Sequence, residues 1–221
     1  MKLLLPSLLT LLGLAVCAPS ETSAQNADAL KVACVGDSIT QGVGAGQGLS
    51  YPTQLGALLG DRFQVKNFGN SGSTLLQTGD KPYNKQPQYK AMLEMKADAY
   101  VIKLGTNDSK PHNWARKADF KPSAFALIDA IREANPKAVI FVCLPVPAFP
   151  ANFGITDEVI RNEVIPLLKE VASEKQTKVI DLYAALEGKK ELVPDRVHPN
   201  AEGYQLISAA VHKALVEHFK P

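Results

Sequence analysis

The stretch Val32-Ala33-Cys34-Val35-Gly36-Asp37-Ser38 decides the fold of this 221-residue chain. Its first four residues form an unbroken apolar run, which is typical of a strand buried on both faces of a sheet. Gly36 ends the run and two polar residues follow, which indicates a turn where the strand ends. In a parallel sheet, ligands bind at the carboxyl ends of the strands, so the hydroxyl of Ser38 lies where a ligand is expected.

Similar apolar runs recur along the chain, and segments with helical spacing of apolar residues lie between them. One such segment carries Phe125, Ile128 and Ile131 on one face. Alternation of strands and helices predicts a three-layer α/β domain with a parallel sheet. We predict its strands over residues 31–35, 63–68, 99–104, 138–144 and 177–182.

Helix ends are also indicated by single residues. Asn200 is expected to cap the last helix, and Thr156 or Asp157 is expected to cap a longer one before it. Pro166 lies inside that longer pattern and is expected to kink or divide it, because proline lacks the N–H that a helix needs.

Composition places the chain among ordinary globular proteins, and its length suits one domain, which we predict over residues 25–221. The net charge is +2 and no long run of like charges is present, so nucleic acid is not an expected partner. Residues 81–90 contain three lysines together with Tyr83 and Tyr89. We interpret that segment as a solvated loop rather than a polyanion site.

The beginning of the chain has the pattern of an export signal. Lys2 is followed by an apolar run over residues 3–16, which is too short to span a bilayer. Small residues at 22–24 favour cleavage before Gln25, so we predict a signal peptide over residues 1–24 and a periplasmic or extracellular protein. Lipoprotein anchoring at Cys17 is disfavoured, because the bulky Val16 stands where a small residue is usual. After cleavage, Cys34 and Cys143 remain in apolar strands and are expected to be free thiols.

Two distant segments carry the parts of a nucleophilic site. Ser38 follows the first strand, and Asp195 and His198 share one loop near the end of the chain. A separation of three residues in a turn lets the carboxylate reach Nδ1 of the imidazole, which leaves Nε2 free to act as a base toward a serine. Taken alone, Asp37-Ser38 is also explained as a helix cap.

Two further segments carry donors for a developing negative charge. Asn107 follows the third predicted strand, and its side-chain amide can donate to an oxyanion. Gly72 lies in a glycine turn, where its backbone N–H is accessible to a ligand, and the N–H of Ser38 is a third candidate donor. Simple turns explain Asn107 and Gly72 individually, but not why all these groups fall at one end of the sheet.

The four segments in this order resemble the sequence blocks of the SGNH hydrolases, also called the GDSL esterase/lipase family. They are Gly36-Asp37-Ser38-Ile39, the glycine of Asn70-Ser71-Gly72, Gly105-Thr106-Asn107-Asp108, and Asp195-x-x-His198. The resemblance implies a flavodoxin-like sandwich with strand order 2-1-3-4-5. It also implies a Ser38, His198 and Asp195 triad, and an oxyanion hole made by Ser38, Gly72 and Asn107. No metal cluster or dinucleotide motif is apparent, and no cofactor is expected.

Within the family, residues 103–114 and 194–203 are similar to exported bacterial carbohydrate acetylesterases, including sialate O-acetylesterase-like proteins. The resemblance implies an acylated small molecule or an acetylated glycan as substrate. Trp114 either stacks on a sugar face or covers the edge of the core.

Two alternatives stay open from the sequence, and so does the oligomeric state. A lysophospholipase, thioesterase or arylesterase would need an acyl groove, which residues 149–153 could line. A silent carbohydrate-binding domain would typically have lost Ser38 or His198, and both are present.

Overall fold

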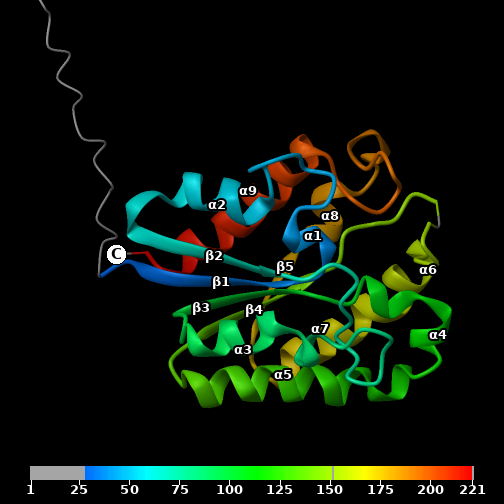
Figure 1. Ribbon diagram of the computed structural model, residues 1–221, viewed down its shortest axis with the longest axis horizontal. Coiled ribbons are helices and arrows are strands. Elements are labelled where there is room, and N and C mark those ends of the chain that lie inside the picture. Colours follow the sequence, from blue (N-terminus) through cyan, green and yellow to red (C-terminus); the bar gives the residue numbers. More distant parts are fainter. Residues whose placement is uncertain (1–27, 151, 221) are drawn as a thin grey trace, which may run out of the picture.

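A computed structural model describes residues 28–150 and 152–220 and contains one five-stranded parallel sheet (Figure 1). The strand order is β2-β1-β3-β4-β5, so the predicted fold class and order are confirmed. The predicted signal peptide and Cys17 lie outside the described residues. The strands are β1 (Leu30–Gly36), β2 (Phe63–Gly69), β3 (Ala99–Lys103), β4 (Val139–Leu144) and β5 (Lys178–Asp181).

Helices cover both faces of the sheet and give the three layers seen in Figure 1. One layer contains α2 (Tyr51–Leu59), α8 (Leu182–Leu186) and α9 (Ala201–His218), and the other contains α3 (Pro87–Glu94), α5 (Phe120–Ala134) and α7 (Ile165–Glu174). The shorter elements are α1 (Ser38–Gln41), α4 (Pro111–Trp114), α6 (Asp157–Val159) and the turns Gly60–Arg62, Tyr83–Lys85, Asn107–Ser109, Lys117–Asp119, Ile160–Val164 and Lys190–Leu192.

The two sides of the sheet bury alternate residues of the same strands, because successive side chains in a strand point to opposite faces. On β1, Val32 and Cys34 pack toward α2 and α9, whereas Ala33 and Val35 pack toward α5 and α7. This explains why the buried residues of the central strands are apolar apart from Lys103 at the end of β3. The edge strand β5 departs from the pattern, since Val179 is 43% exposed.

Cys34 and Cys143 are free and buried in the core on the α2 and α9 side. Burial raises the pKa of the Cys34 thiol to about 12 and raises the pKa of Cys143 further, because the thiolate form loses its hydration. Both thiols therefore stay protonated and unreactive.

Helix α9 starts as expected, with the Asn200 side chain accepting a hydrogen bond of 2.9 Å from the Gly203 N–H. The cap expected at Thr156 or Asp157 is wrong, because neither side chain accepts a bond from the start of α6. Asp157 instead accepts from the Ala148 N–H at 3.1 Å and from the Tyr183 hydroxyl at 2.9 Å. The carboxylate that the local sequence predicted as a helix cap therefore makes tertiary hydrogen bonds instead.

Pro166 lies at the start of α7, directly after a five-residue π-helical turn over Ile160–Val164. Proline has no N–H to donate, and the backbone hydrogen bonds before it follow the wider π-helical pattern. The expected division of the helix is therefore confirmed.

The segment over residues 81–90 is more ordered than the loop we expected. It contains a 3₁₀ turn at Tyr83–Lys85 and the first residues of α3. Tyr83 is buried, and its hydroxyl donates to the Phe68 carbonyl oxygen at 2.7 Å. The lysines favoured a solvated loop, but the buried Tyr83 packs the segment against the end of β2.

Candidate active site

Ser38 stands at the carboxyl end of β1, where Gly36 allows a tight turn. A Cβ at Gly36 would lie 2.1 Å from Thr40 Oγ1 and 2.5 Å from the Lys103 carbonyl oxygen, so only glycine fits there. Ser38 is the first residue of α1, and Asp37 caps that helix by accepting from the Ile39 N–H at 2.9 Å. The helix-cap interpretation and the nucleophile interpretation are therefore compatible.

The structure brings the loop with Asp195 and His198 onto Ser38. His198 Nε2 lies 2.8 Å from Ser38 Oγ, and His198 Nδ1 lies 2.6 Å from Asp195 Oδ2. The other carboxylate oxygen, Oδ1, accepts from the Val197 N–H at 3.0 Å and the His198 N–H at 2.6 Å. These two bonds fix the carboxylate within its own turn, so it is already oriented when it contacts the imidazole.

The ionisation of Asp195 suits this arrangement. Partial burial favours its neutral form, but hydrogen bonds from the His198 amide, the His198 ring and the Val197 amide outweigh burial. The pKa of the Asp195 carboxyl therefore lies below its ordinary value. A carboxylate that stays ionised selects the tautomer of His198 with a proton on Nδ1, and Nε2 can then accept a proton from Ser38.

The strand register brings the loops that carry the other candidate donors to the same edge of the sheet as Ser38. Gly36 pairs with Gly69 of β2 on one side and with Lys103 of β3 on the other, so the loops after all three strands begin at one level. The loop after β2 contains Gly72, whose φ of +79° is a left-handed conformation that favours glycine. Its neighbour Ser71 donates its N–H to the Gln41 side chain at 2.8 Å, which ties this loop to α1.

Asn107 lies in the loop after β3 and is nearly buried. Its Nδ2 donates to the Ser73 carbonyl oxygen at 3.2 Å, which joins the two donor loops. An amide nitrogen carries two hydrogens, so this contact leaves a second N–H for a ligand. The backbone of Asn107 is held by Asn113, whose Nδ2 donates to the Asn107 carbonyl oxygen at 2.9 Å. Sequence reasoning missed Asn113, which lies in α4, and the only signal for it was its closeness to Asn107 along the chain.

Comparison with known protein families gives a match that includes all of these site segments. The sequence model of the GDSL-like Lipase/Acylhydrolase family matches residues 34–206. The chain belongs to this family. The matched region contains Ser38, Gly72, Asn107, Asp195 and His198, which are the residues that the fold brings to one edge of the sheet.

A protein named acetylxylan esterase from Xylanibacter ruminicola is 39% identical to this family member over 211 residues. The match covers 85% of the present chain but 43% of the relative, so the chain spans less than half of that protein's length.

Two solved structures share the fold. One is an acetyl xylan esterase, AlAXEase, with a TM-score of 0.68, 22% identity, and coverage of 84% of this chain and 100% of that one. The other is a putative arylesterase from Agrobacterium tumefaciens str. C58, with a TM-score of 0.68, 21% identity, and coverage of 85% and 99%.

A buried ion pair lies beneath Ser38. Lys103 and Asp37 are fully buried, and Lys103 Nζ lies 3.2 and 3.0 Å from the two Asp37 carboxylate oxygens and 2.6 Å from Thr106 Oγ1. Burial lowers the pKa of Lys103, and the charge of Asp37 opposes this change. Sequence reasoning did not find the pair, although a lysine at the end of an otherwise apolar strand was a signal for it.

A second buried carboxylate, Asp108, holds the loop that follows Gly72. Its oxygens accept from the Leu75 N–H at 3.0 Å and the Leu76 N–H at 2.7 Å. Burial raises the pKa of Asp108 to about 6, although these backbone hydrogen bonds act in the opposite direction. Asp108 therefore links the backbone around Asn107 to the loop that carries Gly72.

Trp114 does not offer a face to a sugar in this structure. It is 7% exposed, lies in the core, and packs edge-to-face on Phe120 with ring centroids 5.4 Å apart. Its position agrees with the other interpretation from the sequence, in which Trp114 covers the edge of the core.

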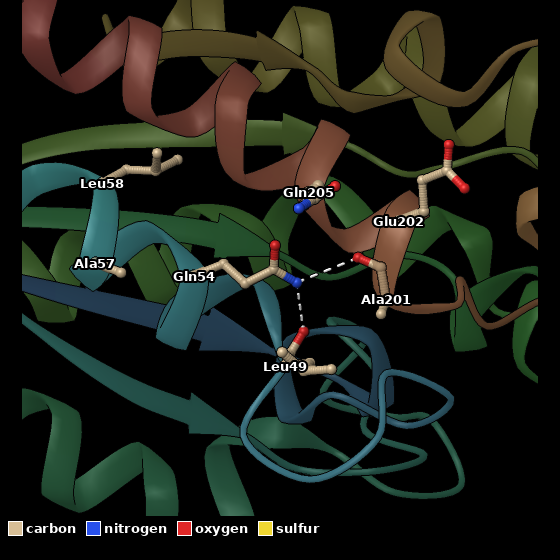
Figure 2. Close-up of a pocket in the computed structure, with 7 residues that line it drawn as sticks. All are labelled: Leu49, Gln54, Ala57, Leu58, Ala201, Glu202 and Gln205. Atoms are coloured by element: carbon tan, nitrogen blue, oxygen red, sulfur yellow. Dashed lines mark hydrogen bonds between the residues drawn. The ribbon is translucent and has the colours of Figure 1, made fainter.

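An open groove of about 680 Å³ lies between α2 and α9 (Figure 2). Across it, Gln54 Nε2 donates to the carbonyl oxygens of Leu49 and Ala201, at 2.7 and 3.2 Å. Its lining includes none of the candidate site residues. It is formed by Leu49, Gln54, Ala57, Leu58, Ala201, Glu202 and Gln205.

Within residues 28–150 and 152–220, no group of three or more His, Cys, Asp or Glu side chains is arranged to hold a metal ion. No helix in this part of the chain is long and apolar enough to cross a membrane.

Proposed function

We propose that this chain is an exported serine esterase that removes O-acetyl groups from carbohydrates through an acyl-Ser38 intermediate. The observation that carries the proposal is the continuous line of hydrogen bonds from Ser38 Oγ through the His198 ring to Asp195, with distances of 2.8 and 2.6 Å. Membership of the GDSL-like family and 39% identity to a protein named acetylxylan esterase support ester hydrolysis and an acetylated glycan as substrate.

In the first half-reaction, Ser38 Oγ attacks the acetyl carbonyl carbon while His198 Nε2 takes its proton. The carbonyl oxygen becomes negative and accepts hydrogen bonds from the Ser38 N–H, the Gly72 N–H and the Asn107 side chain. When the intermediate collapses, the C–O bond to the sugar breaks, and His198 returns the proton to the sugar oxygen. In the second half-reaction, His198 activates a water molecule that releases acetate from Ser38.

The decisive test compares Ser38→Ala with Ser173→Ala, a control that removes an exposed hydroxyl from α7. We expect Ser38→Ala to lose labelling by a fluorophosphonate probe and acetate release from acetylated xylo-oligosaccharides, and Ser173→Ala to keep both. Near-native turnover by Ser38→Ala would refute the proposed nucleophile.

A panel of esters with longer acyl chains distinguishes an acetylesterase from a lysophospholipase, thioesterase or arylesterase. We expect the rate to fall steeply beyond the acetyl group. Equal or faster turnover of long acyl chains would overturn the acetyl preference. Probe labelling of the native protein addresses the silent-domain alternative, because a binding domain without a working triad would not react.

The export part of the proposal rests on the apolar run over residues 3–16 and the small residues at 22–24. The mature domain would then comprise residues 25–221. Expression of the full chain in a bacterium, followed by N-terminal sequencing of the protein outside the cytoplasm, is expected to give a chain that begins at Gln25. A lipidated protein that begins at Cys17 would replace this proposal with membrane anchoring.

A further inference from the structure

The loop between β4 and α6 holds an exposed aromatic ring against the candidate base. The Phe153 ring lies 5.9 Å from the His198 imidazole, measured between ring centroids, with the two planes at 53°. Phe153 is 58% exposed, and among the residues that the structure describes it is the most exposed large apolar side chain. A large aromatic face is therefore open to solvent next to the imidazole of the candidate base.

The backbone conformation at Phe153 is unfavourable for a bulky residue. Phe153 and Gly154 have successive φ values of +53° and +76°, and the Ile155 N–H donates to the Asn152 carbonyl oxygen at 2.8 Å. These are features of a two-residue hairpin turn of type I′, in which glycine, asparagine and aspartate are preferred at the position that phenylalanine occupies here. Strained residues of this kind persist where the surrounding structure fixes them, and they cluster at ligand sites.

The turn is fastened to the loop that carries the triad residues. Asn152 Nδ2 donates to the Asp195 carbonyl oxygen at 2.8 Å, and the Phe149 N–H donates to the Arg196 carbonyl oxygen at 2.9 Å. Phe153 is therefore held relative to His198 before any ligand arrives. Preorganised aromatic surfaces bind with little loss of conformational freedom.

The side of the reacting ester that Phe153 faces follows from the chemistry of the triad. His198 Nε2 must protonate the departing oxygen, so the alcohol part of the ester lies beside the imidazole. The carbonyl oxygen is directed instead toward Gly72 and Asn107. Because the Phe153 ring lies next to the imidazole, the part of the ester that we place beside its exposed face is the alcohol part.

We propose that Phe153 forms a sugar-binding subsite, in which its exposed ring stacks on the apolar face of a pyranose in the alcohol part of the ester. The inference rests on the proposed function, because it takes that alcohol part to be a carbohydrate. Aromatic rings provide large apolar contact areas at binding sites, while the hydroxyl groups at the rim of the sugar remain in water. Phe153 thus takes the role that the sequence suggested for the buried Trp114.

The test uses Phe153→Ala, the aromatic replacement Phe153→Tyr, and Val179→Ala as a control that shortens an exposed apolar side chain on β5. Each variant is assayed on an acetylated xylo-oligosaccharide, on ethyl acetate and on ethyl butyrate. The informative quantity is the kcat/KM for the oligosaccharide divided by that for ethyl acetate. We expect Phe153→Ala to lower this ratio about tenfold, mainly through KM, and the other two variants to change it less than about twofold.

Three results would overturn the inference. An equal loss on all substrates would mean that Phe153 only supports the His198 ring. A loss that appears between ethyl butyrate and ethyl acetate would place the ring beside the acyl group. An unchanged ratio in Phe153→Ala would remove Phe153 from the sugar site.

A binding measurement separates this inference from the proposed function. In the inactive Ser38→Ala background, calorimetry is expected to show that adding Phe153→Ala weakens oligosaccharide binding about tenfold. If the native protein releases no acetate from any glycan, the proposed function fails, and the calorimetric comparison still decides whether Phe153 binds a sugar. Equal affinities of the single and double variants would refute the subsite.

Discussion

Removing the amino group of Lys103 tests how much the stability of the protein depends on pairing the buried Asp37 carboxylate beneath Ser38. In Lys103→Met the side chain keeps much of its length, but the fully buried Asp37 carboxylate loses its cation at 3.0–3.2 Å. It retains the Ile39 N–H at 2.9 Å, and Thr106 Oγ1 loses its partner at 2.6 Å. Breaking one side of a buried pair typically costs about 3–5 kcal/mol of unfolding free energy.

For a domain of this size, each kcal/mol corresponds to about 2–4 °C in melting temperature, so Lys103→Met should melt roughly 6–20 °C below the native protein. The double variant Lys103→Met/Asp37→Asn removes both charges, and we expect it to recover at least half of the loss. Lys90→Met, which breaks a solvent-exposed pair with Glu94, is the control and should melt at the native temperature.

Urea denaturation of all four proteins, with the slope of the transition compared between them, gives the free energies directly. A loss below about 1 kcal/mol for Lys103→Met, or a double variant no more stable than the single one, would show that Asp37 does not need Lys103.

Four further variants, at three residues, test the site and the loops that hold it. Asn107→Ala should lower kcat by about 10²–10³ with little change in KM, and Asn107→Asp should be at least as damaging because it faces a negative oxyanion. An active Asn107→Asp enzyme would contradict the role of the amide. Asp195→Asn should stay folded by circular dichroism but lose about four orders of magnitude in kcat, because the imidazole takes the wrong tautomer, and a small drop would leave Ser38 and His198 as a dyad. Asp108 has its pKa raised from 3.8 to about 6, so the folded state binds its proton more tightly than the unfolded state and stability falls as pH rises between 4 and 6. Relative to Asp108→Asn, the native protein should lose about 2 kcal/mol of unfolding free energy between pH 4 and 6, measured by urea titrations, and a constant difference would refute the raised pKa.

Most of the architecture was predictable because it depends on local patterns. Unbroken apolar runs located the central strands, since strands buried on both faces cannot alternate polar and apolar residues. Asp195 and His198 could be paired from their spacing alone, because three residues in a turn place them within reach of each other. The contact of His198 with Ser38 was inferred from the chemistry that a serine nucleophile needs, from the gathering of polar segments at one end of the sheet, and from the resemblance of four segments to one family.

The parts that the sequence missed or left open depend on contacts between segments far apart in the chain and on the direction of single side chains. Lys103 meets Asp37 because β3 lies next to β1 with Gly36 opposite Lys103, and no local pattern contains that register. Asp157 was expected to cap a helix, but Ala148 and Tyr183 from other segments take its carboxylate. Trp114 lies in a helix of four residues, which is too short for periodicity to show which way its side chain points.

The contact between Ser38 and His198 joins residues 160 positions apart. Closing so long a loop is entropically costly, and contacts of this kind form late when a chain folds. The reactivity of Ser38 therefore marks the completion of folding: a chain still emerging from the ribosome has its serine in place long before it has a base. During refolding from denaturant, probe labelling should recover only after the sheet has formed, so the protein carries its own reporter of the final assembly step.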